Sequence, residues 1–209
     1  MREIALVAFT TYFATIAPLD IAAVFAALTH RTTPSQRISM AFKGTVIGAC
    51  VLLFFAFFGE AVLRNFGISL PALRTAGGIL LLLMAIDMVF ARQSGGMTTT
   101  DEENQEALGK QDVSVFPIAT PLIAGPGSIG ATILLIANAK GDQTHIFTII
   151  AAMLSVVTLA FLLMMVATHV HKLLGVTGLQ VISRVVGVLL AALAMQFIFD
   201  GISASGIFS

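Results

Sequence analysis

One carboxylate in this sequence stands where a charge is costly. Asp20 follows Pro18 inside an otherwise apolar run that spans residues 4–28. A carboxylate inside a membrane span costs about 2.5–3.5 kcal/mol on insertion scales, and such residues mark substrate or ion pathways by default. Asp20 could therefore receive a cation such as an ammonium group, or a proton. Pro18 lacks a backbone N–H and predicts a break in the helix beside it.

A second segment, in the other half of the chain, offers groups of the opposite polarity. Residues 117–127 contain three prolines and two glycines, which predicts that a helix unwinds at Gly125 and then restarts. The freed N–H groups of Gly127, Ser128 and Ile129 would point at an anion such as a carboxylate. Together with the carboxylate of the first segment, these groups suit a small zwitterion.

Four polar residues have both a functional and a structural interpretation. Thr120 and Ser128 flank the second break, where a hydroxyl can bind a substrate or only cap the freed backbone. Arg74 and Arg184 begin two apolar runs at matching positions, so each is a candidate substrate or gating contact. An arginine at the start of a span is also typical of a side chain that snorkels to the membrane surface.

The composition places these residues in a lipid bilayer. Hydrophobic residues make up 57% of the 209 residues, charged residues make up 11%, and the formal net charge is zero. Soluble globular proteins have roughly 45–50% and about 25% of these classes. A soluble enzyme and a nucleic-acid-binding protein are therefore excluded. We also expect no catalytic residues, no metal site and no cofactor, because no metal-ligand cluster or phosphate-binding loop is present.

Six apolar segments are long enough to cross the membrane, for which a helix needs about 20 residues. They are continuously apolar and do not alternate with polar residues, which favours helices over strands. The segments are 4–28, 41–63, 72–90, 113–138, 144–168 and 182–199. A polar stretch in the middle of the chain, residues 93–112, has too little apolar surface to pack and predicts a linker.

The two halves of the chain match in several places, which predicts an internal repeat. A Pro-Leu pair lies in the first and fourth spans, and an arginine followed three residues later by glycine begins the third and sixth. These residues are Pro18 and Pro121, then Arg74 with Gly77 and Arg184 with Gly187 at an offset of 110 residues. Each half holds three spans, so the second half enters the membrane upside down, a layout typical of transporters.

The repeat predicts one transmembrane domain over residues 1–209. It divides into repeat one at 1–92, the linker at 93–112 and repeat two at 113–209. Helices one and four are expected to break near the midplane, where freed backbone groups must meet protein, water or a ligand. Four Lys and Arg residues lie on the side of the termini and seven on the opposite side. The positive-inside rule therefore places both termini outside the cytoplasm.

Three segments carry a family resemblance. Residues 66–78 read FGISLPALRTAGG, residues 121–129 read PLIAGPGSI, and residues 182–187 read ISRVVG, with QFI and DGI behind them. These segments resemble the MarC family of bacterial and archaeal integral membrane proteins, and the similarity runs the length of the chain. The resemblance implies a six-span inner-membrane protein, some of whose relatives are described as transporters of small neutral amino acids such as glycine and alanine.

One position departs from the family pattern. Family members usually carry an acidic or amide residue directly before the first-break proline, and Ala17 stands there in this chain. The nearest carboxylate is Asp20. Either Asp20 takes over the polar role from a different face of the helix, or the choice of substrate differs.

These features predict an all-α membrane protein with a secondary transporter's site between broken spans one and four. The expected substrate is a small neutral amino acid, coupled to a proton or sodium gradient. A passive small-solute channel and a non-transporting membrane scaffold or lipid-binding protein are the alternatives. Small residues four apart, such as Gly44 and Gly48, allow close helix packing and are compatible with a homo-oligomer.

Overall fold

The computed structural model describes residues 2–29, 32–90 and 112–206, and all regular structure in these ranges is helical, as predicted. The helices are α1 (Arg2–Ile16), α2 (Pro18–Leu28), α3 (Pro34–Asn65), α4 (Leu70–Phe90), η1 (Ser114–Ile123), α6 (Pro126–Asn138), α7 (Gln143–Met165) and α8 (Ala167–Ala204). Apart from Asp112, the predicted linker at 93–112 lies outside the described residues.

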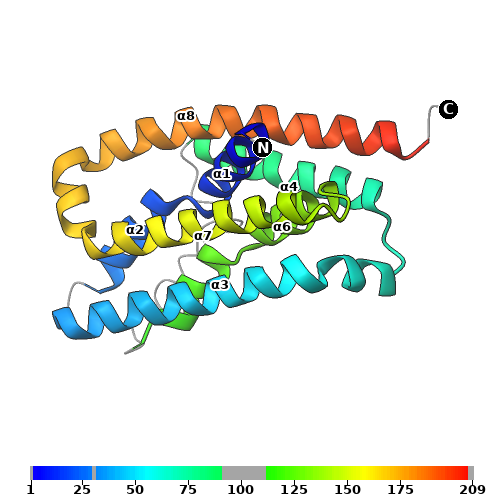
Figure 1. Cartoon of the computed structure of the whole chain (residues 1–209). Helices are drawn as coiled ribbons and strands as arrows, with labels where there is room; N and C mark the ends of the chain where they lie inside the picture. The colour runs from blue at the N-terminus through cyan, green and yellow to red at the C-terminus, as the bar shows by residue number, and fades with distance from the viewer. Residues whose placement is uncertain (1, 30–31, 91–111, 207–209) are drawn as a thin grey trace.

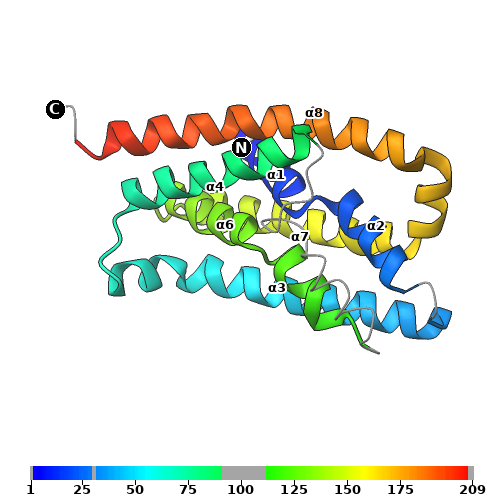
Figure 2. The same ribbon diagram turned by 180° about the vertical axis from the view of Figure 1, so that it is seen from behind.

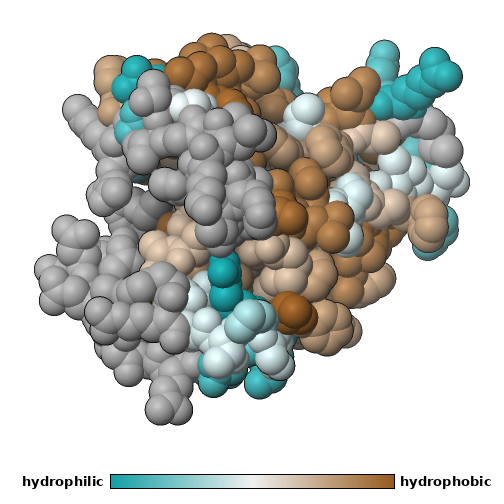
Figure 3. Space-filling view, turned by 90° about the vertical axis from the view of Figure 1, so that its left-hand side faces the viewer, coloured by the Kyte–Doolittle hydropathy of each residue, from teal (hydrophilic) through white to brown (hydrophobic). Residues whose placement is uncertain are grey.

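The helices are long and apolar enough to cross a membrane. Within the described ranges five units meet this test by length and composition, one of them being α1 and α2 together, and the bent pair η1 and α6 makes a sixth if it forms one span. Large apolar side chains point outward: Phe42, Phe57 and Phe58 on α3 are 59%, 65% and 55% exposed. Hydrophobic residues also cover much of the end of the bundle shown in Figure 3. An apolar exterior of this extent is expected to contact lipid.

The long helices pack side by side in a bundle. α8 and α4 lie along one side, α3 lies along the opposite side, and α6 and α7 lie between them (Figures 1 and 2). α1 contacts α6 and α7, and α2 contacts α7 and α8. The two helices of the first span therefore sit against helices from the second half of the chain.

Two helices extend beyond the predicted spans. α3 begins at Pro34 and not near residue 41, because Thr33 caps it: the Thr33 hydroxyl accepts the N–H of Gln36, and the Gln36 side chain accepts the N–H of Thr33. α8 begins at Ala167, so residues 169–181, predicted to connect spans five and six, are helical. No proline interrupts this stretch, and glycine costs a helix only about 1 kcal/mol per residue.

α4 and α8 approach each other through two reciprocal glycine contacts. A methyl group on Gly78 would lie 2.8 Å from the carbonyl oxygen of Ala194, and one on Gly187 would lie 3.1 Å from the carbonyl oxygen of Ala85. Gly78 and Gly187, like Ala85 and Ala194, are 109 residues apart. The contacts thus pair Gly187 with Gly78, not with Gly77 as the sequence match predicted. Two consecutive glycines leave that choice open until the helices are packed.

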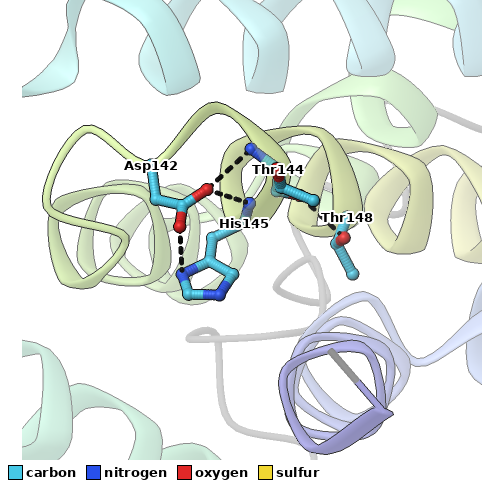
Figure 4. Close-up of polar contacts among 4 residues, drawn as sticks. All are labelled: Asp142, Thr144, His145 and Thr148. Atoms are coloured by element: carbon cyan, nitrogen blue, oxygen red, sulfur yellow. Dashed lines mark hydrogen bonds and ion pairs between the residues drawn. The ribbon is translucent and has the colours of Figure 1, made fainter.

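α7 begins at a side-chain cap. Asp142 accepts hydrogen bonds from the backbone N–H groups of Thr144 at 2.8 Å and His145 at 3.2 Å, and its other oxygen lies 3.7 Å from Nδ1 of His145 (Figure 4). The bonds from His145 and then Thr144 hold the pKa of Asp142 below its usual value. The cap is therefore present at neutral pH and is lost only in acid, as the pH falls through that lowered pKa.

Candidate functional site

The first break lies at Ala17, between α1 and α2. Its φ of 48° and ψ of 65° put it in the left-handed region. The Ala17 N–H nevertheless donates to the carbonyl of Phe13 at 3.0 Å, and the Ala17 carbonyl accepts the N–H of Asp20 at 3.0 Å. Pro18 occupies the first position of α2, where no N–H is needed. The predicted break in the first span is confirmed, and its backbone groups are satisfied locally.

The left-handed backbone gives a physical reason for the residue type that the resemblance implied at this position. A Cβ in this conformation costs about 1–2 kcal/mol, and asparagine and aspartate tolerate it better than other residues with a side chain. Ala17 has no such compensation, and its side chain makes no capping hydrogen bond to α2. The break is therefore kept at a cost in stability.

Ala17→Gly is expected to raise the free energy of unfolding by about 1 kcal/mol, because glycine has no Cβ to oppose the left-handed conformation. The thermal midpoint in detergent should rise by about 2–4 °C. Ala23→Gly, in the middle of α2, is the matched control and should lower the midpoint, since glycine weakens a helix interior. Equal shifts in both variants would show that Ala17 is not strained.

Asp20 is half-buried beside a small cavity at the first break. The cavity has a volume of about 10 Å³, the space of roughly one water molecule. It is lined by Phe13, Ala17, Pro18, Leu19, Asp20, Met88, Ile182 and Val186. The carboxylate is the one charged group in this apolar lining. It also lies in the first turn of α2, where the helix dipole favours a negative charge.

The second break comprises η1 and its turn into α6. Phe116 and Thr120 have extended backbones, with ψ of 125° and 129°. Each precedes a proline, and the proline ring disfavours the helical conformation in the residue before it. Hydrogen bonds in η1 reach five residues back, as from the Ala124 N–H to the Ala119 carbonyl at 2.8 Å. η1 and α6 meet at 51°. The predicted unwinding is confirmed and begins before Gly125.

Ser128 closes the second break with its hydroxyl. The side chain is 1% exposed. It donates to the Ile123 carbonyl at 2.7 Å, lies 3.1 Å from the Gly125 carbonyl oxygen, and accepts the Gly125 N–H at 3.0 Å. In this conformation Ser128 is therefore a cap. Thr120 is half-buried, and its hydroxyl donates to the Val115 carbonyl at 3.4 Å.

The N-terminus of α6 lies under α4. A side chain on Gly127 would collide with the Sδ of Met84. The Ile129 N–H donates to the Gly125 carbonyl at 2.9 Å, so it is engaged and does not face an anion as predicted. The N–H groups of Gly127 and Ser128 are the remaining candidate donors, and Met84 covers them.

One face of α4 brings the two breaks together. Met84 covers Gly127 at the second break, and Met88 lines the cavity that holds Asp20 at the first. The two methionines are 7% and 8% exposed. Four residues apart on a helix, they share a face and are separated by about 6 Å along its axis. A carboxylate and a helix N-terminus thus lie next to the same pair of methionine side chains.

The structure does not bring the predicted arginines to either break. The Arg74 guanidinium donates to the side-chain oxygen of Asn138, at the far end of α6 from Gly125. Thirteen residues of helix separate these ends, or about 20 Å. Within the described ranges the buried Nε of Arg74 has no hydrogen-bond partner. Arg184 is exposed on α8.

Sequence reasoning missed two buried hydroxyls. Tyr12 on α1 donates to the Oγ1 of Thr132 on α6 at 3.1 Å, and both side chains are 0% exposed. Tyr12 is the only tyrosine of the chain. Tyrosines of membrane proteins gather at the lipid–water interface. Its place well inside an apolar run was the available signal that its hydroxyl has a partner in the bundle.

Comparison with known proteins places the whole chain in one group. UPF0056 membrane protein MJ1677 of Methanocaldococcus jannaschii is 37% identical over 199 residues, which cover 94% of this chain and 95% of that one. YvbG of Bacillus subtilis is 31% identical over 194 residues, covering 93% and 92%. YhcE of Escherichia coli is 32% identical over 200 residues, covering 96% and 91%.

The family described as MarC family integral membrane protein matches residues 2–205. No solved structure matches the chain. The apolar helices that cross the membrane and the match over nearly the whole length agree with the resemblance carried by the sequence motifs. The chain is a multi-pass membrane protein that belongs to the MarC family, also called UPF0056.

Proposed function

We propose that the chain is an ion-coupled secondary transporter of a small neutral solute across the inner membrane, with a small amino acid such as glycine or alanine as substrate. The observation that carries the proposal is the meeting of two broken spans at one face of α4. One break holds a carboxylate and the other a helix N-terminus. Discontinuous helices that present such groups to a substrate are typical of secondary transporters.

The amino acid places its ammonium group at Asp20 and its carboxylate at the N–H groups of Gly127 and Ser128. The cavity of about 10 Å³ beside Asp20 is too small for this substrate. Entry therefore requires the side chains of Met84 and Met88 to move, and the flexibility of methionine allows this. Substrate would separate the two breaks from the methionines that now cover them.

Helix packing supports the inverted repeat that this mechanism uses. α1 and α2 of the first span pack on α7 of the fifth, just as η1 and α6 of the fourth span pack on α3 of the second. α2 packs on α8 as α6 packs on α4. These contacts are unchanged when spans one to three are exchanged with spans four to six. Rocking of one repeat against the other would expose the site to each side in turn, with both termini outside the cytoplasm.

Uptake into proteoliposomes tests the proposal. Labelled glycine and alanine should accumulate above the outside concentration when a proton or a sodium gradient is imposed, and accumulation should stop when the gradient is collapsed. Equilibration without accumulation would identify a passive channel. Uptake no greater than that of empty liposomes would contradict the amino-acid assignment.

A further inference from the structure

The two broken spans are tied together by a buried hydrogen bond. The Tyr12 hydroxyl donates to the Oγ1 of Thr132 at 3.1 Å, and both side chains are 0% exposed. Thr132 uses its own hydrogen to donate to the Ser128 carbonyl at 2.7 Å. Its oxygen is therefore the acceptor, and the chain of hydrogen bonds runs from α1 into α6.

Each end of this hydrogen bond is connected to one break. On α1, the residue after Tyr12 is Phe13, whose carbonyl accepts the N–H of Ala17 at 3.0 Å and whose side chain lines the Asp20 cavity. On α6, the chain leads to Ser128, whose hydroxyl closes the second break. A displacement of α1 against α6 would therefore change the separation of the two polar ends of the site.

The Tyr12 hydroxyl differs from the other buried hydroxyls of α1. Thr11 and Thr15 donate to carbonyls of their own helix, those of Val7 at 2.7 Å and Thr11 at 2.9 Å. They add nothing to the relative position of two helices. A phenylalanine ring would fill the same space as Tyr12, and hydrogen bonds between membrane helices contribute little to folding. The hydroxyl is thus suited to alignment rather than to stability.

We propose that Tyr12 is a positioning residue for the substrate. By binding Thr132, it sets the distance from the Asp20 carboxylate to the N–H groups of Gly127 and Ser128, and with it the length of zwitterion that fits. The site then prefers an α-amino acid over a β-amino acid, whose charged groups are one methylene further apart. This inference rests on the proposed function.

Uptake of glycine and β-alanine by Tyr12→Phe and Thr132→Val proteins tests this role. Each variant should raise the KM for glycine about threefold to tenfold, with kcat within about twofold, because one interhelical hydrogen bond is lost. The ratio of kcat/KM for glycine over β-alanine should fall by a similar factor. Thr132→Ser keeps the acceptor and should resemble the wild type. The double variant should be no worse than either single one, since both remove the same bond.

Thr15→Val is the matched control, because it removes a buried hydroxyl of the same helix that has no bond to α6. The ratio should be unchanged in this variant. An unchanged ratio in Tyr12→Phe, or an equal fall in Thr15→Val, would overturn the positioning role while leaving transport established. A wild-type protein that accumulates neither solute would overturn both the positioning role and the proposed function.

Discussion

Replacing Asp20 with asparagine is expected to abolish gradient-driven accumulation of glycine and alanine, with an initial rate at least about 100-fold below that of the wild type. The amide cannot carry the charge that pairs with an ammonium group or binds a proton. An unpaired charge in an apolar surrounding costs about 3–5 kcal/mol, which accounts for a factor of this size. The cavity lining offers no other ionisable side chain to replace it. Uptake of labelled glycine into proteoliposomes measures the effect.

Asp87→Asn is the matched control for this substitution. Asp87 is also a half-buried carboxylate, one residue before Met88 on α4, but it does not line the cavity. We expect near wild-type uptake from it. The Asp20→Asn protein should remain folded, because a first-turn carboxylate is worth only about 0.3–1 kcal/mol to its helix. Wild-type accumulation by Asp20→Asn, or an equal loss in Asp87→Asn, would contradict the role of Asp20.

Gly125→Ala is expected to eliminate transport and to destabilise the protein. A Cβ at this position would collide with the backbone carbonyl oxygen of Pro121, which cannot move aside as a side-chain end can. The turn must shift, and the Ser128 hydroxyl then loses its 3.0 Å contact with the Gly125 N–H. Overpacking of this kind costs about 1–3 kcal/mol, which corresponds to a fall of roughly 2–12 °C in the thermal midpoint.

Gly130→Ala separates the break from the helix that follows it. Gly130 also lies in the first half of α6, but nothing lies within 4 Å of a Cβ built there. Alanine is the better helix former by about 1 kcal/mol, so transport should persist and the midpoint should rise. If Gly125→Ala transports as well as Gly130→Ala, the geometry of the second break does not matter for function.

Both breaks could be predicted from the sequence because their cause is local. Proline removes a donor and restricts the residue before it, whatever the rest of the chain does. The same reasoning covers the extended backbone at Phe116 and Thr120, each of which precedes a proline. The left-handed conformation at Ala17 was beyond it, since alanine carries no signal for that region.

The neighbours of the breaks could not be predicted, because they depend on how helices pack. Nothing distinguishes Met84 and Met88 from other apolar residues of their span until α4 lies against both breaks. The same is true of the partner of Tyr12, which is 120 residues away. Arg74 was a candidate from its type and spacing alone, and the direction of α6 puts its partner Asn138 far from the break.

Binding of labelled glycine to the purified protein most directly tests whether the two breaks form one site. Equilibrium dialysis should find one molecule bound per chain in the wild type and in Gly130→Ala. Binding should be lost in Asp20→Asn and in Gly125→Ala, each of which alters one break only. Undiminished binding in either of these two folded variants would contradict a single site built from both breaks.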